Sequence, residues 1–208
     1  MKLVHWSHKI VTEVKGSHQS EKNRGIGKPH GFWVSDESRG AYGWRTWCRS
    51  EGFRPYGFRY EHHVELADNA KILYLRTAKD IDDFADEYKA DSELNKTMAE
   101  LPHAEWGGAS IYEIDWKRVA KKYHGIIITP YQWKQRLGRH MWYYSWDCAS
   151  GCIWNARAIK SITMVKERKA PPKPTWQEEA RDRRRLMHEL NQSMKAMNKD
   201  LGGEFVMK

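Results

Sequence analysis

The sequence predicts an α+β fold, because strand-like segments outnumber helical ones and the two kinds are mixed along the chain. With 208 residues, the chain is long enough for one domain with a sizeable core but leaves little room for a second. We find no internal repeat. The segments with strand-like composition are 3–6, 31–35, 62–66, 71–75, 126–129, 150–154 and 159–165.

The first two predicted strands flank a glycine-rich segment. Residues 3–6 form a short apolar start, and the glycines at 25–31 permit a tight turn before the strand at 31–35. Residues 36–38 then have the composition of a short helix start. Farther along the chain, the β-branched run 126–129 is typical of a strand.

Two helices are predicted from the residues that cap them. Thr77 precedes a segment in which Ile81, Phe84 and Tyr88 recur at helical spacing. Asp115 holds the same place before a second helix. The apolar side of that helix consists of Trp116, Val119, Ala120 and Tyr123.

A proline-rich stretch at 170–174 divides the chain, because proline lacks an amide hydrogen and biases the residue before it away from helix. We therefore expect a main domain at 1–169, a linker at 170–174 and one long, basic, amphipathic helix at 175–208. The apolar stripe of that helix consists of Leu186, Leu190, Met194, Met197 and Leu201. Its first half carries Arg181, Arg183, Arg184 and Arg185.

The composition favours a flat, anionic ligand. The net charge is +9 and the chain has 11 Trp, 10 Tyr and 5 Phe, a combination that suits nucleotides or nucleic acids. No apolar run of about 18 residues is present, so we expect no membrane span, and the first residues lack the apolar region of a signal peptide. Three cysteines argue against a disulfide framework and for a reducing, cytoplasmic location.

Three segments carry candidate ligand-binding residues. In the first, His5 and Ser7 stand two apart on a strand and point the same way, so they can offer two hydrogen bonds to one ligand. The same pair can also be ordinary surface polar residues. In the second, Tyr42, Trp44 and Trp47 would form a stacking surface or belong to the core. The glycines of this segment match neither a dinucleotide-binding fingerprint nor a P-loop.

The third segment, 142–155, holds two of the three cysteines, four residues apart. A zinc site would need a fourth ligand and usually pairs of closely spaced ligands, so we expect no metal. A nucleophilic Cys148 would need a histidine partner, for which His124 and His140 are candidates. We expect Cys148 and Cys152 to be small buried hydrophobic residues instead.

Taken in order, these segments resemble the histidine–tyrosine–glutamate branch of the ADP-ribosyltransferases, which includes the poly(ADP-ribose) polymerases and diphtheria toxin. Members begin with a strand carrying His-Gly-Ser or His-Gly-Thr, and His5-Trp6-Ser7 stands at that place. A glycine turn, a strand reading roughly Gly-Ile-Tyr-Phe-Ala and a helix with a stacking Tyr follow, and they are similar to 31–35 and Tyr42. The closing strand, roughly Glu-Tyr-Ile-Val-Tyr-Asp, is similar to 150–155.

This resemblance, spread over residues 3–165, implies a core of two small packed β-sheets with flanking helices. It also implies a reaction that transfers ADP-ribose from NAD and releases nicotinamide. The implied catalytic positions are His5, Tyr42, Asp147 and Ser150. The implied NAD-binding positions are Trp6, Ser7, Phe32, Trp33, Ser35, Trp44 and Trp47. In this scheme His5 bonds the adenosine-side ribose and Tyr42 stacks on nicotinamide.

Two residues depart from the family pattern. Trp6 replaces a glycine whose backbone binds nicotinamide, a contact that the backbone of Trp6 can still make. Ser150 replaces the catalytic Glu, whose charge supports an oxocarbenium-like transition state, and Asp147 is the alternative source of charge. If neither supplies it, the protein would be slow or would bind without catalysis. The compact, Trp-rich form with a tail also resembles proteins of bacteriophages, which implies the host cytoplasm.

Two other functions are compatible with the sequence. A non-enzymatic nucleic-acid-binding protein would combine aromatic platforms with the cations Arg45, Arg49, Arg181, Arg183, Arg184 and Arg185. An interaction protein would dock the apolar stripe of its C-terminal helix on a partner, although the stripe can also pack on its own domain. For a transferase, the acceptor could be DNA, RNA or a protein, and the sequence does not specify the oligomeric state.

Overall fold

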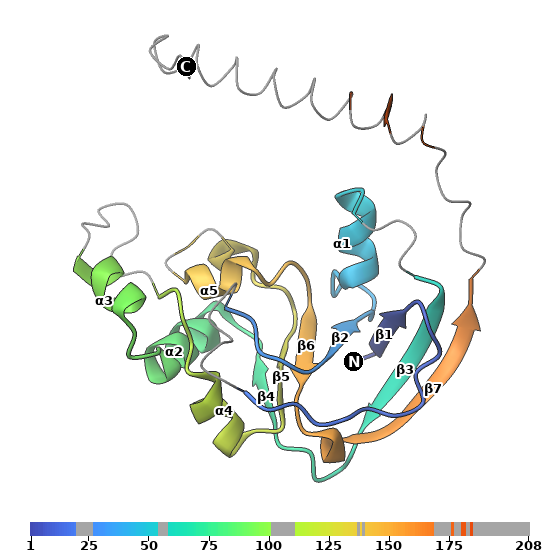
Figure 1. Ribbon diagram of the computed structural model, residues 1–208, viewed down its shortest axis with the longest axis horizontal. Helices are drawn as coiled ribbons and strands as arrows, with labels where there is room; N and C mark the ends of the chain where they lie inside the picture. Colours follow the sequence, from blue (N-terminus) through green and yellow to red (C-terminus); the bar gives the residue numbers. More distant parts are fainter. Residues whose placement is uncertain are drawn as a thin grey trace. The chain divides into compact units, whose positions relative to one another are not determined.

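The structure, a computed structural model, describes residues 1–19, 27–53, 58–100, 111–136, 138, 140–168, 176, 180, 181 and 184. Contacts divide the chain into two compact units, Met1–Lys169 and Ala170–Lys208. The proline-rich stretch begins at this division. The strands and helices named below all belong to the first unit (Figure 1).

Seven strands form one mixed β-sheet in the described part of the chain. They are β1 (Leu3–Ser7), β2 (Phe32–Asp36), β3 (Tyr60–Leu66), β4 (Ile72–Leu75), β5 (Gly125–Ile128), β6 (Ser150–Ile153) and β7 (Ile159–Glu167). Their order along the sheet is β4-β5-β6-β2-β1-β3-β7. Strands β4 and β5 are parallel, and every other neighbouring pair is antiparallel. Each predicted strand is confirmed, with ends that shift by at most two residues.

Five helices accompany the sheet within the described residues. They are α1 (Trp44–Ser50), α2 (Ala78–Tyr88), α3 (Glu93–Glu100), α4 (Trp116–Lys122) and α5 (Met141–Tyr144), and 3₁₀ turns lie at Trp133–Gln135 and Ala156–Ala158. Both predicted caps are confirmed: Thr77 accepts a hydrogen bond from the amide of Asp80, and Asp115 accepts one from the amide of Arg118. None of the helices in the described ranges is long and apolar enough to cross a membrane.

The prediction of an α+β fold is confirmed. The resemblance implied two small sheets, whereas the hydrogen-bonded order runs through all seven strands as one sheet. The reason is the place of β2, which pairs with β1 on one side and with β6 on the other. In Figure 1, helices α2, α4 and α5 gather beside β4, β5 and β6, while α1 stands next to β1 and β2.

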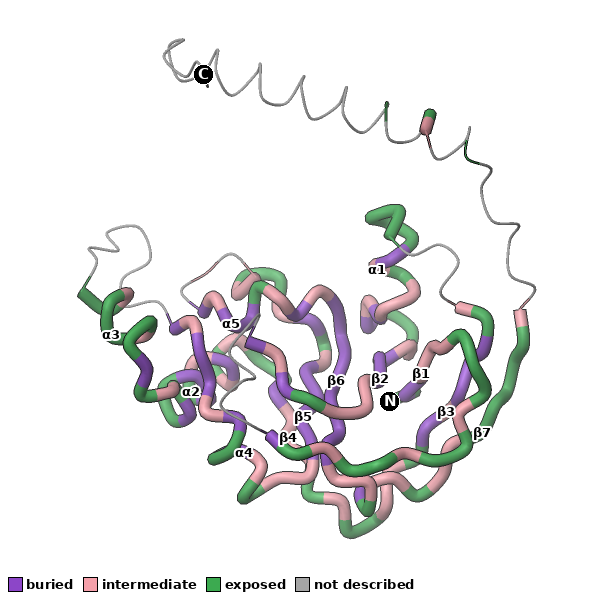
Figure 2. The backbone as a smooth tube through the Cα atoms, viewed as in Figure 1, coloured by how far each residue is buried: buried purple, intermediate pink, exposed green. Residues whose placement is uncertain are grey.

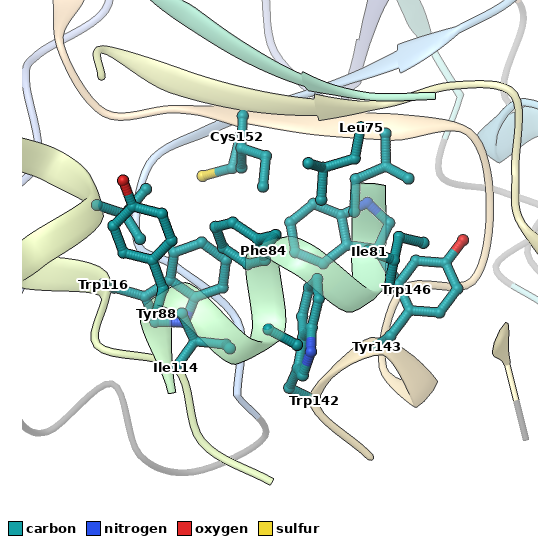
Figure 3. Close-up of a cluster of buried hydrophobic side chains, with 14 of the residues drawn as sticks. Leu75, Ile81, Phe84, Tyr88, Ile114, Trp116, Trp142, Tyr143, Trp146 and Cys152 are labelled. Atoms are coloured by element: carbon teal, nitrogen blue, oxygen red, sulfur yellow. The ribbon is translucent and has the colours of Figure 1, made fainter. Parts of the chain in front are cut away.

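The core occupies both faces of the sheet. Strand β5 illustrates this, because Ile126 and Ile128 belong to one buried cluster and Ile127 belongs to another, as strand alternation requires. Figure 2 shows β5 and β6 as buried along their length. The first cluster is rich in aromatic rings. Figure 3 shows part of it, with Phe84, Tyr88, Trp116, Trp142, Tyr143 and Trp146 near Leu75, Ile81, Ile114 and Cys152.

The short helix predicted at 36–38 does not form. Asp36 instead ends β2, where it is buried and its carboxylate accepts hydrogen bonds from two backbone amides and one hydroxyl. In the turn that follows, Gly40 has a φ of 84° and Tyr42 a φ of 55°. Positive φ angles do not fit a right-handed helix, so α1 begins only at Trp44.

Little of the second unit is described. Trp176, Ala180, Arg181 and Arg184 are helical, and Trp176 is 75% exposed. Outside the described residues lie Arg183, Arg185, the linker 170–174 and the apolar stripe Leu186, Leu190, Met194, Met197 and Leu201. Docking of the C-terminal helix on a partner therefore stays a prediction.

Candidate functional site

A cavity of about 340 Å³ lies against the adjacent strands β1, β2 and β6. The predicted site residues that line it are His5, Trp6, Trp33, Ser35, Trp44, Asp147 and Ser150. Lys28, Cys148 and two valines complete the lining. The fold therefore gathers side chains from all three of the segments that the sequence singled out.

Strand register explains why these segments meet. Ser35 on β2 is the direct partner of Val4 on β1 and of Ser150 on β6. Directly opposed residues share one face of a sheet, so Ser35 and Ser150 reach the cavity together. Trp33 lies two residues before Ser35 on the same face and packs against the buried Trp146, with ring centres 4.9 Å apart.

The predicted site is divided between the two faces of the sheet. His5 and Phe32 alternate with Trp6 and Trp33 along β1 and β2, so their side chains lie on the opposite face, and His5 borders the cavity only as the residue between Val4 and Trp6 on β1. The ring of His5 packs against Phe32, with centres 4.2 Å apart, and its Nδ1 donates a hydrogen bond to the carbonyl of Trp33 at 2.8 Å. Ser7 bonds a nearby backbone carbonyl. These three side chains are thus placed across the sheet from Trp6 and Trp33.

The environment of His5 favours its neutral form. Burial and the nearby His62 lower the pKa of His5, and the hydrogen bond to Trp33 raises it. Burial is the largest of these effects, so the pKa of His5 is lowered. The proton of the neutral ring is on Nδ1, since a carbonyl can only accept. His5 is therefore suited to hold the backbone of Trp33 in place, and its Nε2 can act only as an acceptor.

Tyr42 and Trp47 are not part of the cavity lining. The hydroxyl of Tyr42 shares a hydrogen bond with Ser50 at 2.8 Å, and its ring meets Trp133 edge-on with centres 4.8 Å apart. Trp47 stacks on Trp44, with ring centres 5.0 Å apart and planes 14° apart. Trp44 is therefore the residue of this segment that presents an aromatic wall to the cavity.

Asp147 places a carboxylate at the cavity wall. Its oxygens lie 3.7 Å from the amine of Lys28 and 3.9 Å from the guanidinium of Arg136. Burial raises the pKa of Asp147, and the two cations only partly offset this effect. Burial also lowers the pKa of Lys28, against the effect of Asp147, and the Lys28 amine lies 5.3 Å from the ring centre of Trp33. Burial thus disfavours the charged form of both partners in this ion pair.

Glu37 is a carboxylate that sequence reasoning did not assign to the site. Its Oε1 accepts hydrogen bonds from the hydroxyl of Ser35 at 2.6 Å, the indole of Trp6 at 3.2 Å and the backbone amide of Arg45 at 3.2 Å. Gly43 leaves room for it, since a Cβ there would lie 2.7 Å from Oε1. Ser35 and Trp6 line the cavity, so Glu37 stands directly behind its wall. Only the pairing of β1 with β2 reveals this, and no local motif signals it.

The three cysteines are buried thiols. This confirms the interpretation of Cys148 and Cys152 as small buried hydrophobic residues. Burial raises the pKa of Cys148 to about 12, so its thiol stays protonated at neutral pH and is a poor nucleophile. Of the two candidate partners, His140 lies 2.6 Å from the carboxylate of Asp82, and His124 accepts a hydrogen bond from a backbone amide. Within the described residues, no group of three or more His, Cys, Asp and Glu side chains could hold a metal ion.

The predicted nucleic-acid contacts fall in both units. Arg45 and Arg49 lie one turn apart on α1, next to the aromatic wall of the cavity. Arg181 and Arg184 are exposed helical residues of the second unit.

No protein-family model matches the chain, and neither the curated proteins nor the solved structures include a match. Function therefore has to follow from the cavity and the residues around it.

Proposed function

We propose that the protein is an ADP-ribosyltransferase, which takes NAD as its substrate, releases nicotinamide and transfers ADP-ribose to a nucleic-acid or protein acceptor. One observation carries this proposal. The three segments that resemble the family lie on β1, β2 and β6, which are consecutive neighbours around one cavity. Chain order alone does not require this, since three other strands separate β2 from β6 in the sequence.

The lining of the cavity suits the nicotinamide end of NAD. The nicotinamide ring is flat and positively charged, and indole rings such as those of Trp33 and Trp44 attract cations to their faces. The hydroxyls of Ser35 and Ser150 add polar groups that can orient an amide or a ribose. A volume of about 340 Å³ lies within the range of small-molecule sites, which is about 300–1,000 Å³.

The reaction breaks the bond between C1′ of the ribose and the nicotinamide nitrogen. Nicotinamide leaves as a neutral molecule with both bonding electrons, and positive charge develops on the ribose. The acceptor then donates an electron pair to C1′ and loses a proton. Negative charge near the ribose stabilises this transition state, and the carboxylates available are Asp147 on the wall and Glu37 behind Ser35.

Ser150 and His5 take supporting roles in this scheme. The Ser150 hydroxyl donates to the carbonyl of Cys148 at 3.0 Å, which leaves its oxygen able to accept a hydrogen bond from a ribose hydroxyl. His5 holds the carbonyl of Trp33, so it positions an aromatic wall of the cavity. The negative charge that the catalytic Glu supplies in the ADP-ribosyltransferases would thus come from Asp147 or Glu37, which lie outside β6.

The proposal is tested by measuring nicotinamide release from NAD by the purified protein, alone and with added DNA, RNA or cell lysate. We expect Trp33→Ala to lower the release rate by about fivefold or more, since an aromatic stacking contact is worth about 1–3 kcal/mol. The matched control is Trp133→Ala, because Trp133 is 52% exposed and does not line the cavity. Its rate should equal that of the wild type.

Each result has a distinct meaning. Release that depends on one additive supports a transferase and identifies the acceptor class. Release without any acceptor means that water takes its place and that free ADP-ribose is the product. The proposal is contradicted if the folded protein releases no nicotinamide under any of these conditions, or if Trp33→Ala and Trp133→Ala behave alike.

A further inference from the structure

Two arginines lie against the ring of Trp6, which lines the cavity, and two further cations lie near them. The guanidinium carbons of Arg45 and Arg168 lie 5.7 Å and 5.3 Å from the centre of the Trp6 ring. Arg49 follows Arg45 by one turn of α1, and Lys2 directly precedes β1. We call Lys2, Arg45, Arg49 and Arg168 the basic rim. They come from three parts of the sequence, so the fold has created this concentration of charge.

The neighbouring carboxylates do not balance the basic rim. Glu61 is buried and shared, with one oxygen 2.8 Å from Arg168 and the other 3.4 Å from Lys2. Among the residues that the structure describes, none places a carboxylate within ion-pair distance of Arg45 or Arg49. Burial lowers the pKa of Arg45, the like charges of Arg168 and Arg49 lower it further, and the charges of Glu61 and Glu37 offset this only in part. An anion bound at the rim would relieve this repulsion.

The basic rim adjoins exposed aromatic surface. Arg45 directly follows Trp44, which lines the cavity together with Trp6. Trp47 stacks on Trp44, and Phe53, which is 40% exposed, meets both rings edge-on. Cations interleaved with aromatic rings are the pattern that binds single-stranded nucleic acid, whose phosphates pair with the cations while its bases stack on the rings.

We infer that the basic rim binds a single strand of nucleic acid and presents one of its nucleotides to the cavity as the acceptor of ADP-ribose. The acceptor role depends on the proposed transferase activity, whereas binding of the strand does not. A base of a duplex would have to leave its stack to reach a cavity of this size, which favours a single strand over a duplex. An acidic peptide could form ion pairs with the cations, but it lacks the row of flat bases that would stack on the aromatic side chains.

Binding is tested by fluorescence anisotropy on the full-length protein, with labelled DNA and RNA strands of about 12 nucleotides over a range of salt concentrations. The double variant Arg45→Ala/Arg49→Ala should bind at least about tenfold more weakly. The slope of log K against log salt should fall by about 1.4, because each phosphate contact of a single strand contributes about 0.7. Arg49→Ala alone changes an exposed residue, so it reports on binding without affecting the fold.

The matched control is Arg157→Ala/Lys160→Ala, which removes two exposed cations, one in the 3₁₀ turn before β7 and one at the start of β7, at the other end of that strand from Arg168. It should bind like the wild type. Wild-type affinity in Arg45→Ala/Arg49→Ala would overturn the inference. Equal binding of a duplex of the same sequence, or of a poly-glutamate peptide with the same salt slope, would overturn it as well.

The acceptor role has a separate readout, nicotinamide release from NAD in the presence of the same strands. We expect the strand to stimulate release by the wild type and to stimulate Arg45→Ala/Arg49→Ala much less. NAD turnover that no strand alters would contradict the acceptor role and leave the transferase proposal standing. Strand binding that depends on the rim, without any NAD turnover, would support the nucleic-acid site and contradict the transferase activity.

Discussion

Burial affects the charged side chains around the cavity in different ways. It raises the pKa of Asp147 and lowers that of Lys28, so burial favours the neutral form of each partner. The two side chains still lie within ion-pair distance of each other. Glu37 instead has three donors to one oxygen. A carboxylate held in this way can oppose positive charge without first reorganising. Of the two carboxylates, Glu37 is therefore the one with the more rigid geometry.

Alkaline pH should destabilise the fold through its buried weak acids. Cys148 has a pKa of about 12 in the folded protein against 9.0 when exposed. Above pH 9 the unfolded thiol loses its proton while the folded thiol keeps it, so stability falls as the pH rises from about 9 to about 12. Burial raises the pKa of Tyr131 and of Tyr143 as well, which acts in the same direction.

The check is urea unfolding at about pH 8 and about pH 10.5. Cys148→Ala should lose less free energy of unfolding over this interval than the wild type, by up to about 1.4 kcal/mol per pH unit. The comparison uses the change with pH, so any constant loss of packing in the variant cancels. Identical changes in the two proteins would show that Cys148 does not contribute.

Sequence reasoning identified individual site residues only where a segment looked unusual by itself. Trp33, Ser35 and Ser150 fall in such segments, and all three line the cavity. Lys28 and Glu37 fall in a glycine-rich loop and a turn, where side-chain direction depends on the final path of the chain. Their place beside the cavity follows from long-range pairing, which spacing along the sequence cannot reveal.

Among the elements, β2 determines the shape of the site. It pairs with β1 and β6, and its two faces serve different purposes. Trp33 and Ser35 reach the cavity, while Phe32 and Val34 contribute to the second buried cluster. The sequence predicted this strand to within one residue, because its apolar run follows a glycine turn. It did not predict the turn after it, whose positive φ angles delay the start of α1.

Gly43, the residue before α1, should not tolerate a side chain. A Cβ at this position would lie 2.5 Å from the carbonyl oxygen of Asp36 and 2.7 Å from the carboxyl group of Glu37. Gly43→Ala should therefore lower the free energy of unfolding by about 1–3 kcal/mol, since the turn or Glu37 must move. Urea unfolding measures this. Gly16→Ala, whose Cβ would come no closer than 3.4 Å to a neighbour, is the control, and equal losses in both variants would refute the explanation.

Across the whole molecule, two buried clusters on opposite faces of one sheet hold the fold together. The class of fold could be predicted from the sequence because strands and helices have local signals. The strand order could not, since β2 and β6 become neighbours only through pairing over a long stretch of chain. The cavity depends on that pairing. Sequence patterns could therefore indicate some of its residues, but they could not predict the cavity itself.

Residues 1–169 should fold without the rest of the chain. Both buried clusters and all the strands of the sheet lie within this unit. We expect a protein ending at Lys169 to unfold in one cooperative transition, at a temperature close to that of the full chain. Circular dichroism during heating provides the measurement. Loss of the cooperative transition would mean that the second unit is required for stability.

The nine-residue strand β7 ends the sheet with β3 as its partner and exposes Met164 and Val165. An edge strand of this length offers a row of unpaired backbone groups to any other chain. Lys160 and Lys166 are exposed along it, and irregular register at two points of its pairing with β3 bends the edge. Solubility at high concentration thus depends on these few charges. Their loss would allow copies of the protein to associate edge to edge through β7.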